Sequence, residues 1–390
     1  MGNIELANGN LVISGRIDST NAPELEAKIT GILEENSFDN LEVDCAKLNY
    51  ISSAGLRLIL KLRKAIPGIR LINVSDEVFD IFQITGFTEM MEVQRAFKVV
   101  SIEGCEVIGQ GANGKVYRID PETIVKAYIN TDSLPDIKRE RELARKAFVL
   151  GVPTAISYDV VKLKEGGYGS VFELLKATSL NKLLKSGEKS MDELVEMSVG
   201  LLKVIHSCEV DAGSLPDMKQ VVLEWIEFDR DYLPADQYEK LKALVQAVPE
   251  TNHLLHGDYH IKNVLVQNGE CLLIDMDTLC YGHPIFEFAS MYNDYCGYSY
   301  LDPEVSMNFY GVSHDEVVEF WRKSLALYLG TDDAARLDDV ERKAMLIGFA
   351  RILRRAVRKM VSGSEEQEQT MANARKQIAG ILPLVDTLEF

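Results

Sequence analysis

Three side chains with oxygen atoms, Asp258, Asn263 and Asp275, lie close together in the second half of the chain. A carboxylate can orient an attacking hydroxyl group or accept its proton. Carboxylate and amide oxygens are also suitable ligands for Mg2+. Phosphoryl transfer needs both functions, because the acceptor must be aligned and the charge of the phosphates must be neutralised. These residues are therefore candidates for chemistry on a phosphate group.

The segment between these residues is predicted to be a β-hairpin. Two short apolar runs, residues 264–266 and 272–274, are separated by a turn that contains Asn268-Gly269. Asn-Gly readily adopts the positive φ angles of a tight two-residue turn. We therefore expect the aspartate and asparagine before the first strand to meet the aspartate after the second.

The spacing of the polar residues follows a known pattern. His256, Asp258 and Asn263 give His-x-Asp-x-x-x-x-Asn, with a second acidic residue one hairpin later, as in kinases. Gly257 and His260 make the segment most similar to the aminoglycoside phosphotransferase and choline kinase group. The alternative is that His256 and Asp258 only cap a loop before a core hairpin.

A glycine-rich segment lies further upstream. Gly109, Gly111, Gly114 and Val116 form Gly-x-Gly-x-x-Gly-x-Val between two strand-like runs. A dinucleotide-binding fingerprint would need a helix after the third glycine, but β-forming residues and Pro121 follow instead. A strand–turn–strand flap fits better, with backbone N–H groups against the phosphates of a nucleotide. A glycine-rich hairpin without function is the alternative.

Lys126 lies in a short apolar strand, where a charged group is costly unless it is paired. In the kinase pattern this lysine contacts the α- and β-phosphates and pairs with a helix glutamate. The next helix offers Glu140 and Glu142, which face different sides, and Glu140 fits better when counted from the end of the helix. A later segment resembles the kinase hinge, so the backbone of Glu173 and Leu175 would face adenine.

The resemblance to these phosphotransferases extends from about residue 102 to the end of the chain. It implies an α+β two-lobed protein-kinase-like domain, with a β-rich N-lobe (99–178) and a helical C-lobe (179–390) that contains the catalytic loop and the acceptor site. ATP and Mg2+ would bind between the lobes. After residue 179, apolar residues recur at spacings of three and four, which agrees with a helical C-lobe.

The resemblance also implies a role for each polar residue. Asp258 would orient or deprotonate the acceptor hydroxyl group, Asn263 and Asp275 would hold Mg2+, and Lys126 would bind the phosphates. The chain lacks the long activation segment of protein kinases after Asp275. This absence favours a small-molecule acceptor over a protein.

Two positions differ from the pattern of this group. Gly282, Pro284, Glu287 and Ala289 resemble Gly-x-Pro-x-x-Asp-Leu-Ala, with Glu287 in place of the usual aspartate. Lys262 occupies a position that is more often glycine or acidic. It would either hold the transferred phosphate or be a solvated lysine in a turn.

A helix in the C-terminal third has an arginine-rich face. Arg351, Arg354, Arg355 and Arg358 follow one another at i, i+3, i+4 and i+7, which places them on one side. A solvated face that balances nearby acids is the default interpretation. The alternative is that these residues line the acceptor cleft and favour an anionic substrate.

Residues 1–98 form a separate unit in which strands alternate with helices, which predicts an α/β structure. The unit opens with an Asn8-Gly9 turn and a helix capped by Asn21. Residues 15–18, 43–44 and 50–57 resemble the STAS domain of anti-sigma factor antagonists. The resemblance implies regulation or docking of a protein partner.

The usual phosphorylated serine of STAS domains is replaced by Ala54. Ser52 and Ser53 precede it at the predicted N-terminus of a helix, where a phosphate would be tolerated electrostatically. Either serine is thus a candidate phosphosite. The competing interpretation is an ordinary helix N-cap.

Composition excludes several classes of protein. The net charge of −18 and a pI near 4.9 argue against a nucleic-acid partner or an anionic membrane surface. The six cysteines lack the paired short spacing of a zinc site, and most lie in apolar runs. No membrane span or signal pattern is apparent, so we expect a cytoplasmic protein.

The sequence therefore predicts an ATP-dependent, aminoglycoside phosphotransferase-like kinase that phosphorylates a hydroxyl group, with a STAS domain for regulation. An enzymatic alternative is a protein-kinase-like activity on a STAS serine or a partner. A non-catalytic alternative is a nucleotide-sensing switch. No transferable motif identifies the acceptor.

Overall fold

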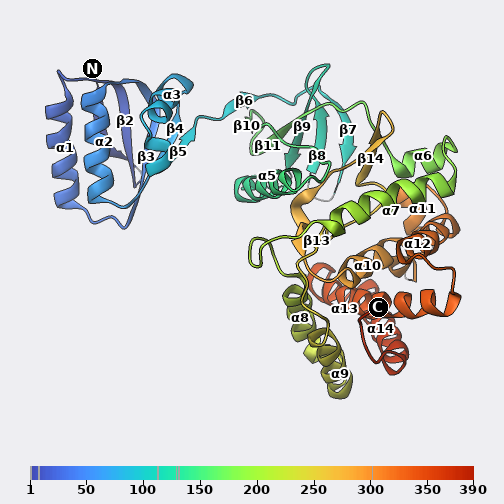
Figure 1. Ribbon diagram of the computed structural model, residues 1–390. Coiled ribbons are helices and arrows are strands. Elements are labelled where there is room, and N and C mark those ends of the chain that lie inside the picture. The colour runs from blue at the N-terminus through green and yellow to red at the C-terminus, as the bar shows by residue number, and fades with distance from the viewer. Residues whose placement is uncertain (1, 8, 112–113, 129, 131, 301) are drawn as a thin grey trace. The chain divides into compact units, whose positions relative to one another are not determined.

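The computed structural model describes residues 2–7, 9–111, 114–128, 130, 132–300 and 302–390. The chain forms two compact units, one of residues 1–103 with 160–166 and one of residues 104–159 with 167–390 (Figure 1). Asn8 of the predicted first turn, and the two residues between Gly111 and Gly114, lie outside the described residues.

The first unit is an α/β structure built on a five-stranded sheet in the order β1-β2-β3-β4-β5. β1 and β2 are antiparallel, and the remaining neighbours are parallel. Helices α1 and α2 pack against each other. The elements are β1 (Asn3–Ala7), β2 (Asn10–Ile17), α1 (Ala22–Glu35), β3 (Asn40–Ile51), α2 (Ser53–Ala65), β4 (Gly68–Val74), α3 (Asp76–Ile84), α4 (Phe87–Met90) and β5 (Glu92–Arg95).

Helix α2 begins where the STAS resemblance is strongest. The Ser52 hydroxyl accepts a hydrogen bond from the backbone N–H of Ala54 at 3.2 Å, so Ser52 is an N-cap. Gly55 follows at a point of close packing. A Cβ atom there would lie 2.6 Å from the Ile51 side chain and 2.8 Å from that of Ile17. The helix therefore approaches the sheet closely only because residue 55 is glycine.

The prediction that the Asn21 side chain caps helix α1 is wrong. Asn21 occupies the N-cap position of α1, but its side chain makes no capping hydrogen bond. Its Oδ1 accepts from the backbone N–H of Asp18 at 2.9 Å, and its Nδ2 donates to the Arg16 carbonyl at 2.7 Å. The amide is thus used to close the preceding turn, which competes with capping for the same oxygen.

The first unit ends in a strand that pairs with a later hairpin. β6 (Lys98–Val100) runs parallel to β10 (Asp159–Leu163). The Glu165 carboxylate accepts hydrogen bonds from the backbone N–H groups of Ile102 and Glu103, both at 3.0 Å. These contacts explain why residues 160–166 belong to the first compact unit.

The second unit starts with an antiparallel sheet in the order β11-β9-β8-β7, accompanied by α5. The elements are β7 (Glu106–Gln110), β8 (Gly114–Arg118), β9 (Thr123–Tyr128), α5 (Leu134–Val149) and β11 (Tyr168–Glu173). This part is the β-rich lobe that the sequence predicts.

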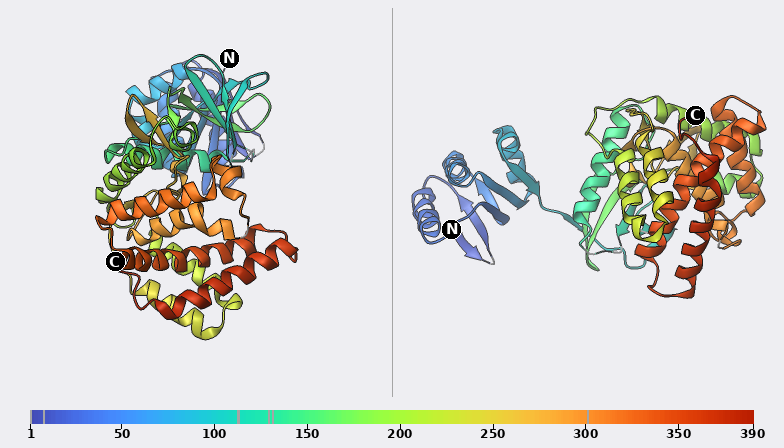
Figure 2. Two further views of the ribbon diagram at one scale, coloured as in Figure 1. Left: turned by 90° about the vertical axis from the view of Figure 1, so that its right-hand side faces the viewer. Right: turned by 90° about the horizontal axis from the view of Figure 1, so that it is seen from below.

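The remainder of the second unit is mainly helical, and it surrounds short strands that carry the candidate site. Helix α13 packs against α8, α10 and α14, and Figure 2 shows α13 and α14 running side by side. The elements are β12 (Thr178–Ser179), α6 (Leu180–Ser186), α7 (Met191–Ser207), α8 (Met218–Asp229), α9 (Ala235–Gln246), β13 (Leu254–Leu255), β14 (Val264–Gln267), β15 (Glu270–Leu273), β16 (Cys280–Tyr281), α10 (Ile285–Tyr292), α11 (Val305–Tyr310), α12 (His314–Leu329), α13 (Ala334–Lys359) and α14 (Glu365–Ile381).

The predicted fold class is therefore confirmed: an α/β unit is followed by an α+β, kinase-like unit. A single large apolar core holds the helical lobe together, with Trp321, Phe320 and Phe349 almost completely buried. Among the described residues, no helix combines the length and apolarity that crossing a membrane requires.

Candidate active site

The predicted β-hairpin is present. β14 and β15 pair in an antiparallel register from Val264 opposite Leu273 to Gln267 opposite Glu270. Asn268 and Gly269 connect them with φ angles of 52° and 85°, as a tight turn of this type requires. The two-residue connection fixes the register, so the residues at the open end of the hairpin face each other.

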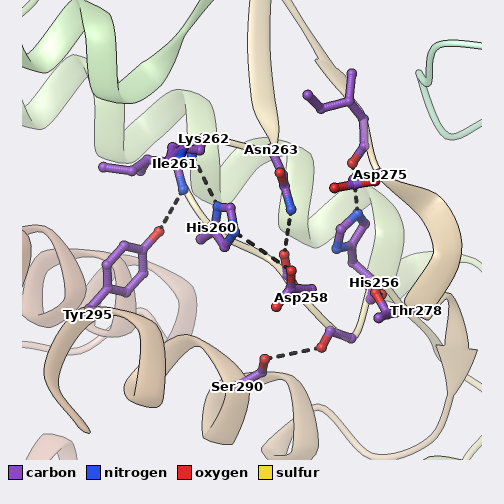
Figure 3. Close-up of polar contacts among 12 residues, drawn as sticks. His256, Asp258, His260, Ile261, Lys262, Asn263, Asp275, Thr278, Ser290 and Tyr295 are labelled. Carbon is purple, nitrogen blue, oxygen red and sulfur yellow. Dashed lines mark hydrogen bonds and ion pairs between the residues drawn. The ribbon is translucent and has the colours of Figure 1, made fainter. Parts of the chain in front are cut away.

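The open end of the hairpin brings the polar residues of the motif together (Figure 3). The Asn263 side-chain Nδ2 donates to the Asp258 carbonyl at 3.0 Å. The Ile274 N–H donates to the Asn263 carbonyl at 3.0 Å, and His256 Nε2 lies 3.2 Å from the Ile274 carbonyl. Asp275 follows Ile274 in the chain, so the two ends of the site are joined by one backbone hydrogen bond and by the His256 ring.

A buried carboxylate holds the start of residues 256–263, the candidate catalytic segment. Glu287 is fully buried and accepts from the backbone N–H groups of His256 at 2.6 Å and Gly257 at 3.0 Å. Burial acts to raise the pKa of Glu287, but His206 and these His256 contacts hold that pKa below its ordinary value. Gly257 has a φ of 82°, and a Cβ there would lie 2.5 Å from the Thr278 carbonyl oxygen. Glu287, in place of the usual aspartate, thus holds the backbone of His256 and Gly257 in position.

His260 is a neutral neighbour of Asp258. Its Nδ1 accepts from the Lys262 N–H at 3.3 Å, which leaves the proton on Nε2, 3.7 Å from Asp258 Oδ2. The ring packs edge-on against Phe309 and Tyr310. Burial lowers the pKa of His260 to about 4, against the attraction of Asp258. His260 therefore presents an N–H, and no charge, toward the carboxylate at neutral pH.

Lys262 is neither fully solvated nor paired with an acid among the described residues. Its Nζ lies 3.8 Å from the centroid of the Phe309 ring, a cation–π contact. Partial burial lowers the pKa of this lysine. Both of its predicted roles, phosphate contact and turn lysine, remain compatible with this position.

Lys126 connects the β-rich lobe to the hairpin. Its Nζ lies 2.9 Å from Glu140 Oε1 on α5 and 2.6 Å from Asp275 Oδ1. Tyr128, two residues further along β9, donates its hydroxyl to Glu140 Oε2 at 2.7 Å. Burial acts to lower the pKa of Lys126, but Asp275 and then Glu140 outweigh it, so the net shift is upward. The lysine is therefore charged when it contacts both acids.

The runner-up glutamate does not reach Lys126. Glu142 pairs with Lys146 at 3.3 Å, one turn along the exposed face of α5. The same helix contacts the hairpin end through Arg139, whose Nη2 donates to the Asp277 carbonyl at 3.0 Å. The choice between the two glutamates thus follows from helical geometry, because residues two positions apart face different sides.

The two acids at the end of the hairpin have opposite pKa shifts. Burial acts to raise the pKa of Asp275, but Lys126 lowers it below its ordinary value. Burial, together with Asp275 and Glu140, raises the pKa of Asp277 to about 6. Asp275 has left-handed backbone angles, φ 66° and ψ 63°. Such strain in a non-glycine residue is common at functional sites.

The glycines of the upstream loop differ in their surroundings. A Cβ on Gly114 would lie 2.2 Å from the Ala127 carbonyl oxygen, so this position must be glycine for steric reasons. At Gly109 a Cβ would make only ordinary contact with Val116, and at Gly111 it would meet no described atom within 4 Å. Internal packing therefore does not explain these two glycines. Val116 lies opposite Lys126 in the register of β8 and β9.

The hinge residues follow β11. Glu173 is the last residue of that strand and lies opposite Thr123 of β9. The next backbone N–H, that of Leu174, donates to the Glu122 carbonyl at 2.6 Å. Leu175 lies in the connection to β12, at the junction of the sheet and the helical lobe. The adenine contacts of Glu173 and Leu175 stay a prediction.

The donor set at the hairpin end fits Mg2+. Asp275 supplies carboxylate oxygens. The hydrogen bond from Asn263 Nδ2 to the Asp258 carbonyl fixes the side-chain amide of Asn263, so that its oxygen points away from that carbonyl. Mg2+ usually takes one or two protein groups and completes its shell with phosphates and water. The described residues contain no cluster of three His, Cys, Asp or Glu side chains suited to a metal.

Sequence reasoning missed several residues that support this site. Tyr128 could have been found, because its spacing of two from Lys126 places both on one face of a strand. Ser290 could not, since no local pattern connects it to the motif. The Ser290 hydroxyl donates to the Gly257 carbonyl at 3.1 Å, and Arg351 donates to Ser290 at 2.7 Å.

A two-lobed fold with a lysine–glutamate pair and a polar hairpin defines a kinase-like phosphotransferase. Comparison with known families agrees: residues 104–305 match the phosphotransferase enzyme family, and residues 4–100 match the STAS domain. The chain therefore belongs to the phosphotransferase enzyme family and carries a STAS domain ahead of its catalytic part.

Curated relatives match the first unit. A protein of Bordetella bronchiseptica named as a candidate anti-sigma factor antagonist, BtrV, is 31% identical over 85 residues, which is 21% of this chain and 72% of BtrV. The anti-sigma-B factor antagonist of Staphylococcus aureus is 29% identical over 91 residues, which is 22% of this chain and 83% of that protein. These matches support the STAS assignment.

Solved structures are similar in fold to most of this chain. The aminoglycoside phosphotransferase APH(4)-Ia is 13% identical, with a TM-score of 0.50, and the match covers 79% of this chain and 99% of that one. A thermostable mutant of that enzyme, in a ternary complex with AMP-PNP and hygromycin B, gives 13% identity, a TM-score of 0.50 and coverage of 72% and 93%. At this identity the likeness concerns the fold alone.

Proposed function

We propose that this phosphotransferase transfers the γ-phosphoryl group of ATP to a hydroxyl group of a small molecule. One observation carries the proposal: Lys126 contacts Glu140 of α5 and Asp275 of the hairpin at the same time. A partly buried lysine between two acids from distant segments is costly to assemble for stability alone. The same arrangement is what a kinase uses to hold phosphates and metal in line.

The residues of the chain divide the work of the reaction. Lys126 binds the phosphates, and Asp258 accepts a hydrogen bond from the acceptor hydroxyl and then its proton. The hydroxyl oxygen forms a bond to the γ-phosphorus while the bond from that phosphorus to the ADP oxygen breaks. Asn263 and Asp275 would hold Mg2+, which when bound neutralises charge on the phosphate oxygens. The products are a phosphate ester and ADP.

Neutral His260 supports Asp258 in this role. Its Nε2–H, 3.7 Å from Asp258 Oδ2, can orient the carboxylate without adding a positive charge that would make it a weaker base. Glu287 holds the backbone on the other side, through His256 and Gly257. Both contacts favour one orientation of Asp258 before the acceptor arrives.

Glycine residues and the hinge complete the nucleotide site in this proposal. Gly109 and Gly111 leave room for backbone N–H groups to approach the phosphates, and the backbone of Glu173 and Leu175 would face adenine. The STAS unit supplies regulation or a docking surface for a protein partner. The N-cap contact of Ser52 favours a structural role for that serine over a phosphosite.

Phosphoryl transfer from labelled ATP to a panel of hydroxyl compounds tests the proposal. Asp258→Asn should reduce kcat by about 10^2- to 10^4-fold, because a positioned proton acceptor contributes that much. Nucleotide binding should persist, because Asp258 does not bind the nucleotide. Asp332→Asn, an exposed residue between α12 and α13, is the matched control and should be fully active.

Two results would contradict the proposal. Full transfer by the Asp258→Asn enzyme would remove Asp258 from the reaction. Tight Mg·ATP binding by the wild-type protein, with no label transferred to any member of the panel, would favour the nucleotide-sensing alternative.

A further inference from the structure

A cavity of about 360 Å³ lies beside the catalytic segment. Gly257 and the turn after Asp275 form one wall, and helices α5, α8 and α13 supply the others. Gly257 directly precedes Asp258, so a molecule in the cavity reaches the backbone next to the proposed base. The volume falls within the range of small-molecule sites, about 300–1,000 Å³.

Arg351 of α13 lines this cavity and is attached to the catalytic segment. Its Nη1 donates to Ser290 at 2.7 Å, and Ser290 donates to the Gly257 carbonyl at 3.1 Å. The guanidinium lies 5.5 Å from the centroid of the Trp225 ring, which lines the cavity too. A half-buried arginine is therefore held at a fixed place near Asp258.

No ion pair joins Arg351 to a carboxylate among the residues that the structure describes. Asp294 is its electrostatic neighbour, but burial, and then Asp258, raise the pKa of Asp294 well above its ordinary value. Burial therefore opposes the ionisation of Asp294 beside Arg351. A buried carboxylate beside an arginine usually ionises to pair with it, so this arrangement is unusual.

Arg354, one turn along α13, is in the same situation. It lies 5.7 Å from the centroid of the Trp225 ring and faces Asp229. Asp229 is completely buried, and burial raises its pKa to about 8. Burial, Arg358 and Arg351 lower the pKa of Arg354.

The other cations on the cavity wall also make contacts of their own. Lys146 pairs with Glu142 at 3.3 Å and donates to the Ser214 carbonyl at 3.1 Å. Arg139 donates to the Asp277 carbonyl at 3.0 Å. Among the described residues neither Arg139 nor Arg351 forms an ion pair, and Arg351 is the one that is tied to the segment of Asp258 through Ser290.

We infer that the acceptor of this enzyme is a small hydroxyl compound that carries an anionic group, a phosphate or a carboxylate, bound by Arg351 beside Trp225. The inference rests on the proposed function and specifies its substrate class. The acceptor hydroxyl oxygen bonds to the γ-phosphorus, its proton goes to Asp258, and ADP leaves. The product then carries the original anion and a new phosphate ester.

Arginine suits this task because its planar fork donates two parallel hydrogen bonds to a phosphate or a carboxylate. The contact with Ser290 uses one N–H group and orients the rest of the fork. A cationic acceptor would meet an uncompensated positive charge in this cavity, which would weaken its binding.

Isothermal titration calorimetry on the full-length protein tests the inference. Mg·AMP-PNP is bound first, so that the phosphate subsites of the nucleotide are filled. Inorganic phosphate, glycerol 3-phosphate, glycerate and neutral glycerol are then titrated at constant ionic strength. Saturable binding of at least one of the anions, and none of glycerol, is the expected result. Glycerol 3-phosphate and glycerate distinguish a phosphate site from a carboxylate site.

Variants of two arginines locate the site. Arg351→Gln, which keeps a donor for Ser290 but removes the charge, should weaken the anion by about tenfold or more, because hydrogen bonds to charged groups contribute this much. Arg351→Lys should recover part of the loss. Arg375→Gln, on the exposed face of α14, is the matched control and should bind as the wild type does. In the Trp321→Phe protein, Trp225 is the remaining tryptophan, and its fluorescence should follow the same isotherm.

The outcomes separate this inference from the proposed function. Equal anion binding by Arg351→Gln and wild type, or no anion binding while AMP-PNP binds, overturns the inference alone. Failure of AMP-PNP to bind contradicts the proposed function, and it is measured in the first step of the same experiment.

Discussion

The two units of this protein bury different kinds of side chain. In the described residues of the first unit, every buried side chain is apolar, and its ion pairs lie at the surface. The second unit buries Glu140, Glu287, Asp229 and several histidines. Burying charge costs free energy that apolar packing must offset. The buried charges of the second unit agree with its membership of a phosphotransferase family.

The largest expected effect comes from comparing two variants, each of which removes the lysine of an ion pair in one unit. Lys126→Met leaves Glu140 and Asp275 without their cation and should destabilise the second unit by about 3 kcal/mol. It should also reduce transfer by about 10^3-fold or more, since the phosphates lose their contact. Lys61→Met breaks an exposed pair with Glu26 and should cost less than about 1 kcal/mol.

Urea unfolding of each variant and the rate of label transfer provide the measurements. Equal destabilisation by the two lysine variants would show that the Lys126 pairs are as well solvated as a surface pair. That result would contradict the contrast between the units.

Low pH should reduce the stability of the second unit through protonation of a buried histidine, an effect that the first unit lacks. All six histidines belong to the second unit. The pKa of His260 in the folded protein is about 4, below its ordinary value of 6.5, because burial disfavours the charged ring. The unfolded chain therefore binds the proton first as pH falls. The stability that neutral His260 contributes is present above about pH 6.5 and is lost toward pH 4.

The comparison of wild type with His260→Gln isolates this effect from the acids of the same unit, whose raised pKa values act in the opposite direction. Between pH 6.5 and pH 4 the wild type should lose about 3 kcal/mol relative to the variant, from a shift of roughly two and a half pKa units. Urea unfolding at a series of pH values measures the loss. A parallel pH dependence of the two proteins would place His260 in a solvated position.

The smallest expected effect concerns the first unit. Ser52→Ala removes the cap contact with the Ala54 N–H and should destabilise this unit by about 1 kcal/mol. Ser53→Ala is the matched control, because Ser53 makes no capping hydrogen bond in the described structure. Thermal unfolding compares them. Transfer activity should be unchanged in both, and a change in Ser52→Ala alone would indicate communication between the units.

Local patterns predicted the parts of the site that are close in sequence. The Asn268-Gly269 turn determines the hairpin, and helical periodicity separates Glu140 from Glu142, because both depend on few neighbouring residues. The contacts of Arg351 with Ser290 and Trp225 join helices from distant parts of the chain, and no periodicity encodes them. Asn21 shows the limit of local rules, since its amide closes a turn in place of capping a helix.

The anchoring of the catalytic segment by Glu287 has a consequence for the evolution of such enzymes. Glu287 belongs to α10 and holds His256 and Gly257, whereas the cavity walls come mainly from α5, α8 and α13. Side chains of the wall helices can therefore diverge while Asp258, the proposed base, keeps its place. A lineage built in this way can exchange one acceptor for another through changes in the lining, without rebuilding the part that performs the transfer.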